Sequence, residues 1–575
     1  MRIRRILLST LVVGSLLALT AGWVGVRGWQ TRGHLTSAAG LARDLSTQIV
    51  AGDVAQARRT LDALQRQTAA ARTTSGDPTW ALAGRLPFGG ANLAAVHEVA
   101  TTLDELARRT FPDLLRVDVA ALTPRDGRVD LATISAAARD ITAADTSAQA
   151  IRASFARSPD GLAGPVREAV VQVHDTLDRL VRLTFAARQA AMLLPPLLGA
   201  KGERNYLFAF QNPAEVRATG GMFGAYAVVR VADGRARIVK QGAGTGLGVF
   251  ANPLPVEVEL RRLFGDLAGI YPADVNLSPH FPTAATLYRE MYRRHTGQTV
   301  DGVLATDPVA LAHLLRVTGP VELTGGTALT SATAVKALLS DVYRQPSEKQ
   351  DGYFARATKA VFDALLTRPL DMRAVVTALG QSVAERRLLF WSAHPEEQKT
   401  IAGTAIAGIL PDQETTPRVG VFLNDGTGAK LSYYLRPEAT LSVADCRPDG
   451  RRELRLRVTL GSTAPRSGLS PSVLGFESRK ASKRYTVRTL VSVYSPAGGA
   501  VLRARMDGEP IGVGAGRERR RHIGVATVDL APGQTRVLEV DLLTPVTDSG
   551  AAELQVTPLA TPWTTRISSA PSCSE

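Results

Sequence analysis

The N-terminal segment of the chain combines a basic start with a long uncharged run. Arg2, Arg4 and Arg5 precede the residues from Ile6 to Val26, none of which is charged. As an α-helix this run would span about 30 Å, the thickness of the hydrocarbon core of a bilayer. The pattern predicts a transmembrane anchor within residues 1–30, with the arginines in the cytoplasm and the bulk of the chain extracytoplasmic. A cleaved signal peptide is the alternative.

Residues 31–195 show the spacing of amphipathic helices. Apolar residues recur at i, i+3, i+4 and i+7 in stretches such as DVAQARRTLDALQRQTAAA and VREAVVQVHDTLDRLVRLTF. Turn-forming residues interrupt the pattern at 75–78, 87–90 and 158–161. We therefore expect a helical stalk or bundle, whose apolar stripes are packing surface.

In residues 196–430 short apolar runs alternate with helical stretches. The segment NYLFAFQ predicts a strand, and two alternating runs around Asp233-Gly234 predict a β-hairpin. The strand-like run GVLATD ends at Asp307, and Pro308 follows it, which is the form of a helix N-cap with proline in the first turn. Strands alternating with helices predict a central α/β sandwich.

Residues 431–575 lose the helical pattern. Seven short alternating runs, among them RELRLRVTL and TRVLEVDLL, are separated by turn residues, and this spacing predicts a C-terminal β-sandwich. The fold class expected for the whole chain is therefore multidomain α+β. Its four parts are the transmembrane anchor, the helical stalk or bundle, the central α/β sandwich and the C-terminal β-sandwich.

The chain has two cysteines, Cys446 and Cys573. In an oxidising compartment such a pair is a candidate disulfide, and it would close a loop of more than a hundred residues. A bridge of that length contributes about 4–5 kcal/mol in the chain-entropy model. Two unpaired thiols are the alternative.

Composition and charge narrow the classes of function. Of the 575 residues 45% are hydrophobic, which excludes global disorder. Lys and Arg number 68 against 53 Asp and Glu, a formal net charge of +15. This favours an anionic neighbour such as nucleic acid, a phospholipid surface or an acidic polymer, but a compositional bias toward arginine is the preferred explanation. The basic runs at 478–484 and 516–522 carry no interleaved aromatic residues, so nucleic-acid binding is not indicated.

Common hydrolytic chemistries lack their motifs. The eight histidines form no H-x-x-H or H-E-x-x-H arrangement, and no G-x-S-x-G occurs. The glycine-rich run QGAGTGLG lacks the Lys-Ser/Thr of a phosphate loop and is better explained as a flexible loop. Zinc hydrolases and serine hydrolases are therefore disfavoured.

A candidate ligand site follows the first predicted strand of the central part. Arginine offers a two-pronged fork to phosphate, and glycines let backbone N–H groups approach an anion. Polar groups that converge at strand ends are the default binding site of α/β folds. The alternative is a tight turn in which Arg217 pairs with Glu215 or another carboxylate. The candidate residues are Arg217, Thr219, Gly220, Gly221, Asn205, Gln211 and Asn212.

The sequence also offers candidates for a metal site. Asp274 lies in a polar loop with Asn276, Ser278 and His280, and Asp301 precedes a predicted strand. Such oxygen-rich side chains suit Mg²⁺ or Ca²⁺. Their spacing matches no known metal motif, so no metal ligand is assigned.

Several phrases resemble the bacterial family catalogued as DUF 4012, in its actinobacterial form. They are QNPAEVRATGGMFGAYAVVRVADGR, DVNLSPHFPTAA, VDGVLATDPVALAHLLRVTGPVEL and VFLNDGTGAKLSYYLR, in this order. The resemblance implies a membrane-tethered envelope protein. It implies no activity, because the family has no established one.

The segment VDGVLATDPVALAHLLRVTGPVEL is also similar in layout to part of the LytR-CpsA-Psr family. That resemblance implies an extracytoplasmic enzyme that moves a glycopolymer from a polyprenyl-pyrophosphate carrier, with arginines and an Asp-held metal. The corresponding segment here, Arg217 to Gly221, lacks the Asp.

The function expected from the sequence is that of an anchored cell-envelope protein. The first hypothesis is that the protein is a scaffold or binding module for envelope glycans or glycolipids. The alternative is a phosphotransferase acting on a polyprenyl-linked glycopolymer, with Arg217 as pyrophosphate ligand and Mg²⁺ as cofactor.

Overall fold

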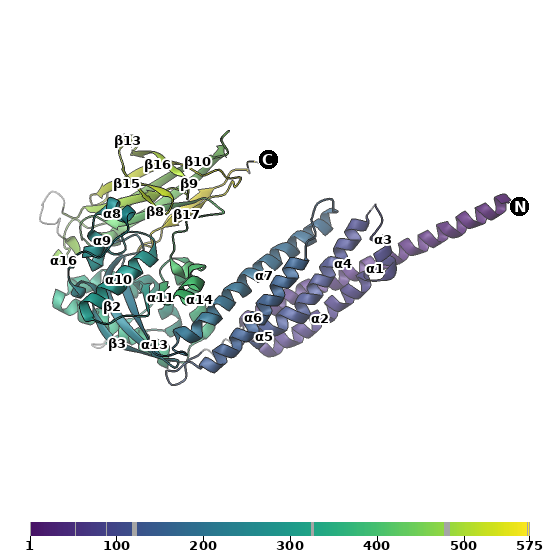
Figure 1. Ribbon diagram of the computed structural model, residues 1–575, viewed down its shortest axis with the longest axis horizontal. Helices are drawn as coiled ribbons and strands as arrows, with labels where there is room; N and C mark the ends of the chain where they lie inside the picture. Colours follow the sequence, from purple (N-terminus) through teal and green to yellow (C-terminus); the bar gives the residue numbers. More distant parts are fainter. Residues whose placement is uncertain are drawn as a thin grey trace. The chain divides into compact units, whose positions relative to one another are not determined.

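The computed structural model divides into two compact units (Figure 1). The first comprises residues 1–122 and 130–196, and the second comprises residues 123–129 and 197–575. The structure describes residues 2–51, 53–87, 89–117, 123–323, 327–475, 484–571 and 573.

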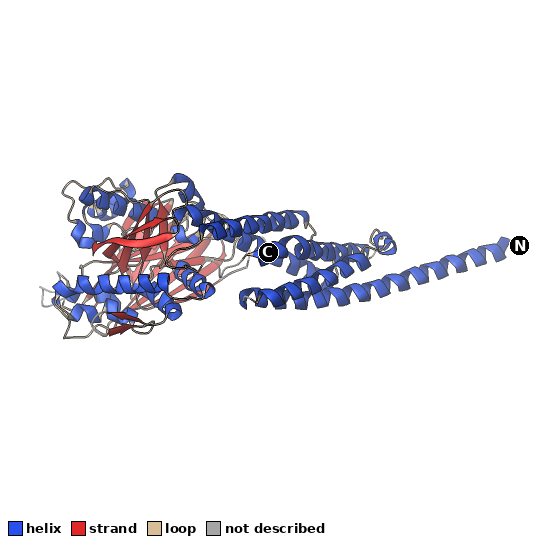
Figure 2. Cartoon of the chain, turned by 90° about the horizontal axis from the view of Figure 1, so that it is seen from below, coloured by secondary structure: helices blue, strands red, loops and turns tan. Residues whose placement is uncertain are grey.

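The described part of the first unit is helical (Figure 2). Aspartates begin several of its helices, since the side chains of Asp53, Asp77 and Asp130 each accept a backbone N–H of the first turn. Apolar residues at helical spacing form its cores, as the sequence pattern predicts. Its helices are α1 (Arg2–Ala51), α2 (Val54–Ser75), α3 (Pro78–Ala83), α4 (Gly90–Glu105), the π-helix η1 (Leu106–Thr110), α5 (Phe111–Arg116), α6 (Leu131–Ser154) and α7 (Gly164–Leu197).

The transmembrane helix predicted over Ile6–Val26 is wrong. Within the described part of the chain, no helix is both long enough and apolar enough to cross a membrane. The uncharged run is only the first part of α1, which continues to Ala51 and packs on α2 through Leu45. Near the end of the run, Trp23 Nε1 donates to Asp77 at 3.4 Å, so this ring contacts a helix start of its own unit.

A mixed sheet forms the centre of the second unit. Its strand order is β3-β2-β1-β4-β7, with β1 antiparallel to β2 and parallel to β4. The turn between β2 and β3 is Asp233-Gly234, both with positive φ, as a two-residue hairpin of right-handed twist requires. The strands are β1 (Arg204–Asn212), β2 (Met222–Ala232), β3 (Arg235–Ala243), β4 (Gly302–Thr306) and β7 (Leu389–Ser392).

Helices cover both faces of this sheet. On one face α10 (Phe281–Thr296) packs on Leu207, Ala209 and Val303. On the opposite face lie α11 (Pro308–Thr318), α12 (Ala334–Leu339), α13 (Ser347–Thr367) and α14 (Met372–Ala384), which line a cavity together with residues of the sheet. Other short elements before the next sheets include α8 (Val258–Phe264), α9 (Leu267–Ile270), β5 (Val321–Leu323), β6 (Thr327–Leu329) and α15 (Pro395–Ala402).

Two further sheets share one apolar core in the C-terminal part. One has the order β13-β12-β16-β10-β9-β18 and the other β14-β15-β11-β8-β17. Leucines and valines from both sheets form the core, and β8 contributes to it although it begins before residue 431. The strands are β8 (Arg418–Asp425), β9 (Leu435–Cys446), β10 (Arg452–Ser462), β11 (Val487–Tyr494), β12 (Ala500–Met506), β13 (Glu509–Ile511), β14 (Gly514–Glu518), β15 (Arg521–Leu530), β16 (Thr535–Leu543), β17 (Glu553–Val556) and β18 (Thr564–Ser568).

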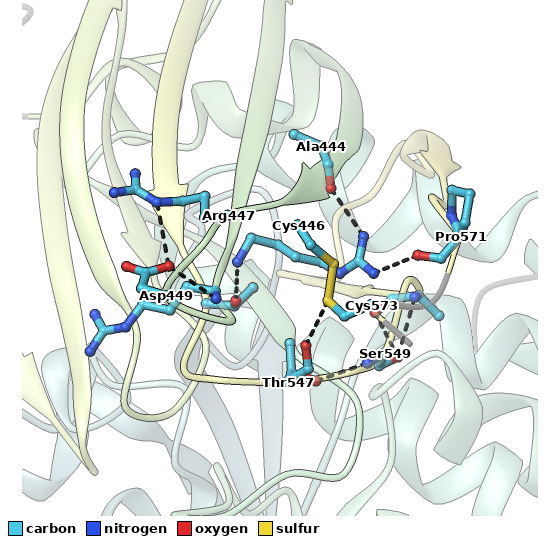
Figure 3. The surroundings of a disulfide bond; sticks show 12 residues. Ala444, Cys446, Arg447, Asp449, Thr547, Ser549, Pro571 and Cys573 are labelled. Atoms are coloured by element: carbon cyan, nitrogen blue, oxygen red, sulfur yellow. Dashed lines mark hydrogen bonds and ion pairs between the residues drawn. A yellow bond between two sulfur atoms is a disulfide. The ribbon is translucent and has the colours of Figure 1, made fainter. Parts of the chain in front are cut away.

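The two cysteines form a disulfide, as predicted (Figure 3). Cys446 ends β9 and Cys573 follows β18, which lies parallel beside β9. The buried guanidinium of Arg452 donates to the carbonyls of Ala444 and Pro571, on the two sides of the bridge. Covalent and polar contacts therefore hold the tail to the edge of the sheet.

Of the two basic runs, at 478–484 and 516–522, the structure describes mainly the second. The run at 478–484 lies outside the described residues except for Arg484. The run at 516–522 forms the β14–β15 hairpin, where Arg521 is 1% exposed and paired with Glu414. Arg521 is therefore part of the protein interior and is not available on the surface for an anionic partner.

Candidate functional site

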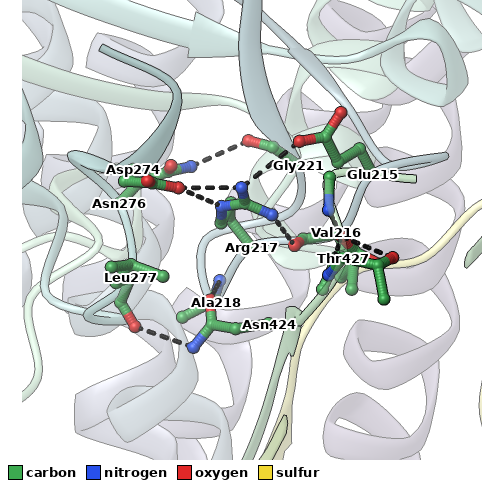
Figure 4. Close-up of polar contacts among 12 residues, drawn as sticks. Glu215, Val216, Arg217, Ala218, Gly221, Asp274, Asn276, Leu277, Asn424 and Thr427 are labelled. Carbon is green, nitrogen blue, oxygen red and sulfur yellow. Dashed lines mark hydrogen bonds and ion pairs between the residues drawn. The ribbon is translucent and has the colours of Figure 1, made fainter. Parts of the chain in front are cut away.

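The loop that joins β1 to β2 carries Arg217, which lies beside the loop of Asp274 (Figure 4). Its guanidinium donates to Asp274 Oδ1 from Nε at 3.1 Å and from Nη2 at 2.8 Å. Nη2 also reaches Glu215 Oε1 at 3.3 Å, and Nη1 donates to the Val216 carbonyl at 2.9 Å. Every guanidinium nitrogen therefore has a partner in the chain, and Arg217 is 5% exposed. The structure favours the alternative interpretation of Arg217 as an internal cross-link.

Thr219 is the polar centre of the same loop. Its Oγ1 accepts from Gln211 Nε2 at 2.8 Å and from Asn276 Nδ2 at 2.7 Å. Asn276 also donates to the Gly221 carbonyl at 2.8 Å. A Cβ on Gly221 would lie 2.1 Å from the carbonyl carbon of Asn212, so glycine is required there by close backbone packing.

Two polar residues far along the chain complete the loop, and sequence reasoning did not select them. Asn424 in β8 accepts from Ala218 N at 3.0 Å and donates to the Leu277 carbonyl at 3.1 Å. Thr557 Oγ1 donates to the Ala218 carbonyl at 3.2 Å. The signal for Asn424 was its position in the otherwise apolar run VGVFLN, where an amide needs partners.

Further charges surround this loop. Lys430 Nζ lies 3.2 Å from Glu215 Oε2, and it also lies 5.3 Å from the centre of the Tyr343 ring. Burial and the Glu215 carboxylate raise the pKa of Asp425 to about 6, against the opposing effect of Arg217 and of the Thr427 N–H. Several charged side chains, those of Glu215, Arg217, Asp425 and Lys430, therefore lie close together around this loop.

Asn205 and Asp301 lie away from the loop that carries Arg217 and Thr219. Asn205 is near the start of β1 and Asn212 at its end, about 23 Å apart along an extended strand. The Asn205 N–H donates to Asp301 Oδ2 at 2.8 Å, and Asp301 Oδ1 lies 2.9 Å from His394 Nε2. Asn205 is thus separated from Arg217, Thr219 and the other candidate ligands.

The acidic candidates for a metal have protein partners. Asp274 is bound by Arg217, and Asp301 lies between Arg204 and His394. In the ranges that the structure describes, no three His, Cys, Asp or Glu side chains gather as a metal site would require. Asp307 has the structural role predicted for it, because its Oδ1 accepts from Val309 N and Ala310 N at 2.9 and 2.8 Å.

His280 is a buried neutral base. Its Nδ1 accepts from Leu410 N at 3.0 Å, which requires this nitrogen to be unprotonated. Burial lowers the pKa of His280 to about 3, and the nearby Arg519 and Arg386 act in the same direction.

We expect His280 to make the protein acid-sensitive. Its folded-state pKa lies below that of an unfolded histidine, so the unfolded chain takes up the proton first and stability falls as the pH drops below about 6.5. Between pH 6.5 and 4.5 the free energy of unfolding should fall by about 2–3 kcal/mol more than in a His280→Gln variant. Denaturant unfolding of both proteins across this range measures the difference, and parallel pH profiles would refute it.

An apolar cavity of about 510 Å³ lies on the sheet face opposite α10. Phe208 and Phe210 of β1 face it, while their neighbours Leu207 and Ala209 are fully buried against α10. Helices α11, α13 and α14 form its other wall, mainly through the apolar residues Leu311, Leu314, Phe354, Ala357, Val361, Phe362, Leu365 and Leu379.

Polar residues of the Arg217 region line part of this cavity. Gln211, Asn212 and Lys430 belong to its lining. Asn212 donates to the Tyr343 hydroxyl, and Lys430 pairs with Glu215. The cavity thus combines a large apolar wall with a small number of fixed polar groups, the usual composition of a ligand pocket.

Comparison with known proteins gives one family match, and it covers most of the central sheet. No curated protein and no solved structure matches the chain. The resemblance to the LytR-CpsA-Psr family is not supported. Residues 201–343, which contain β1 to β6 and helices α8 to α12, match the family described as "Protein of unknown function (DUF4012)", and this confirms the resemblance to that family.

Proposed function

We propose that the protein is an extracytoplasmic cell-envelope protein whose second unit binds the apolar chain of an envelope glycolipid. The observation that carries the proposal is the cavity on the central sheet. It is of the size of ligand pockets, about 510 Å³, and most of its lining is apolar.

The contrast between the two faces of β1 and β4 supports a ligand on one of them. Leu207 and Val303 are 0% exposed beneath α10. Phe208 and Leu304, on the other face, are only partly buried and line the cavity. Apolar surface accessible to water is costly, at about 25 cal/mol per Å², so a hydrocarbon chain that covers it gains free energy.

The disulfide supports the proposed location. Disulfides persist in oxidising environments and are rare in the cytosol. Cys446 and Cys573 are bridged, which suits a chain that functions outside the cytoplasm.

A phosphotransferase is the second hypothesis carried from the sequence. In that reaction Arg217 would bind a pyrophosphate, and it would first have to leave Asp274 and Glu215. Binding of an apolar chain requires no such rearrangement, so we favour the binding module.

A bulky side chain placed in the cavity should displace the ligand. Ala225 of β2 lines the cavity and is partly buried, so Ala225→Phe occupies space that the chain would use. A loss of about 60 Å² of apolar contact corresponds to about 1.5 kcal/mol, or about a tenfold weaker affinity. Native mass spectrometry of the protein purified in mild detergent should show a bound amphiphile that is depleted in this variant.

The matched control is Ala515→Phe, at an exposed residue of β14 outside the cavity. It should retain the amphiphile of the wild type. Folded wild-type protein without any amphiphile, or equal occupancy in Ala225→Phe and wild type, would contradict the proposal.

A further inference from the structure

The backbone of Arg386 has an unusual conformation for its residue type. It follows the C-terminus of α14 with φ of 57°, in the left-handed region. Its N–H donates to the Val383 carbonyl at 2.9 Å, and Arg387 N donates to Ser382 O at 2.8 Å. Glycine is the usual residue at this position of a helix end, and a residue with a side chain strains the backbone there. The chain therefore places an arginine where the backbone favours glycine.

The guanidinium of Arg386 is held by neutral oxygens. With its amide oxygen turned toward Arg386, Gln555 accepts from Nε, Nη1 and Nη2 at 3.1, 3.2 and 3.2 Å. Nη2 also lies 3.3 Å from the Pro279 carbonyl and 3.5 Å from the Gly408 carbonyl. Among the described residues, no carboxylate pairs with it. Burial and the nearby Arg418 lower the pKa of Arg386 to about 10.

Three buried arginines of the same unit differ in this respect. Arg217, Arg387 and Arg521 each pair with a carboxylate, at 2.8, 2.7 and 2.5 Å. A buried cation without an anionic partner is unfavourable, and an added anion removes that cost. Arg386 differs from these three because its direct contacts are neutral oxygens, a property that it shares with Arg452, which the Ala444 and Pro571 carbonyls hold.

Arg386 lines a cavity of about 590 Å³ together with Arg418. Arg418 begins β8 and pairs with Glu553 at 2.6 Å, and both of these side chains are partly exposed. Glu385 also lines the cavity and pairs with Arg387 at 2.8 Å. The small residues Ala402, Gly403 and Ala405 also line the cavity.

We propose that this cavity is a binding site for an oxyanion, a phosphate or carboxylate group of a small ligand, held between Arg386 and Arg418. The planar guanidinium fork matches two oxygens of such a group, and hydrogen bonds to it are stronger than those to neutral carbonyls. The described residues that line this cavity all differ from those of the apolar cavity, so the site is independent of the proposed lipid binding.

Thermal unfolding with inorganic phosphate tests the site, against sodium chloride at equal ionic strength. A ligand that binds only the folded state raises the unfolding midpoint as its concentration exceeds Kd. We expect phosphate to raise the midpoint of the wild-type protein. Acetate in place of phosphate distinguishes a carboxylate site from a phosphate site.

Arg386→Gly is the decisive variant, because glycine suits the left-handed backbone and the substitution removes the side chain with its guanidinium. It should lose the response to the oxyanion. The control Arg566→Gln, an exposed residue of β18, should keep it. An unchanged response in Arg386→Gly, or a wild-type protein that responds to neither anion, would overturn the proposal.

Discussion

Replacing Arg217 with alanine should lower the free energy of unfolding by about 3–5 kcal/mol at neutral pH. The variant leaves Asp274 and Glu215 without the guanidinium that joins them, and Glu215 is 8% exposed at its side chain. Removing one partner of a buried ion pair is costly, because the remaining charge stays out of water. Urea unfolding of the full-length chain measures the loss.

The loss should not require any ligand. Arg293→Ala, which removes the exposed pair with Glu290, is the matched control and should have little effect. A stable Arg217→Ala protein would show that Arg217 does not hold the loop.

Reducing the disulfide should cost about 5 kcal/mol of unfolding free energy. The bridge joins residues 127 positions apart, and a closed loop of this length restricts the unfolded chain strongly. Denaturant unfolding with and without a thiol reductant measures the effect. A Cys446→Ser/Cys573→Ser double variant should start from the lower stability and show no response to the reductant.

Polar contacts around the bridge also hold the C-terminal tail to the sheet. Arg452 binds the Ala444 and Pro571 carbonyls without the sulfur atoms, so the tail keeps part of its attachment after reduction. Equal stability of the oxidised and reduced proteins would mean that these contacts alone fix the tail.

Local features of the fold were predictable because they depend on neighbouring residues. The hairpin turn at Asp233-Gly234 and the cap formed by Asp307 each follow from a few adjacent side chains. The disulfide was predictable for a different reason, since a chain with two cysteines permits one pairing. In these cases little knowledge of the tertiary structure was needed.

Features that depend on distant residues were not predictable. Arg217 was selected from its loop, but its partner Asp274 lies 57 positions away, and only the tertiary structure shows that the pair is closed. The apolar cavity lies between β1 and α13, and periodicity gives no measure of the space between them. The transmembrane prediction failed because an uncharged run does not reveal that the helix continues and packs within its own unit.

The hydrogen bonds of Ala218 also affect when the protein can finish folding. Its N–H and carbonyl bind Asn424 and Thr557, which follow it by 206 and 339 positions. A ribosome adds about 5–20 residues per second, so about 20–70 seconds separate the synthesis of Ala218 from that of Thr557. During this interval the loop lacks its final partners, and the second unit completes its structure only after nearly the whole chain has been translated.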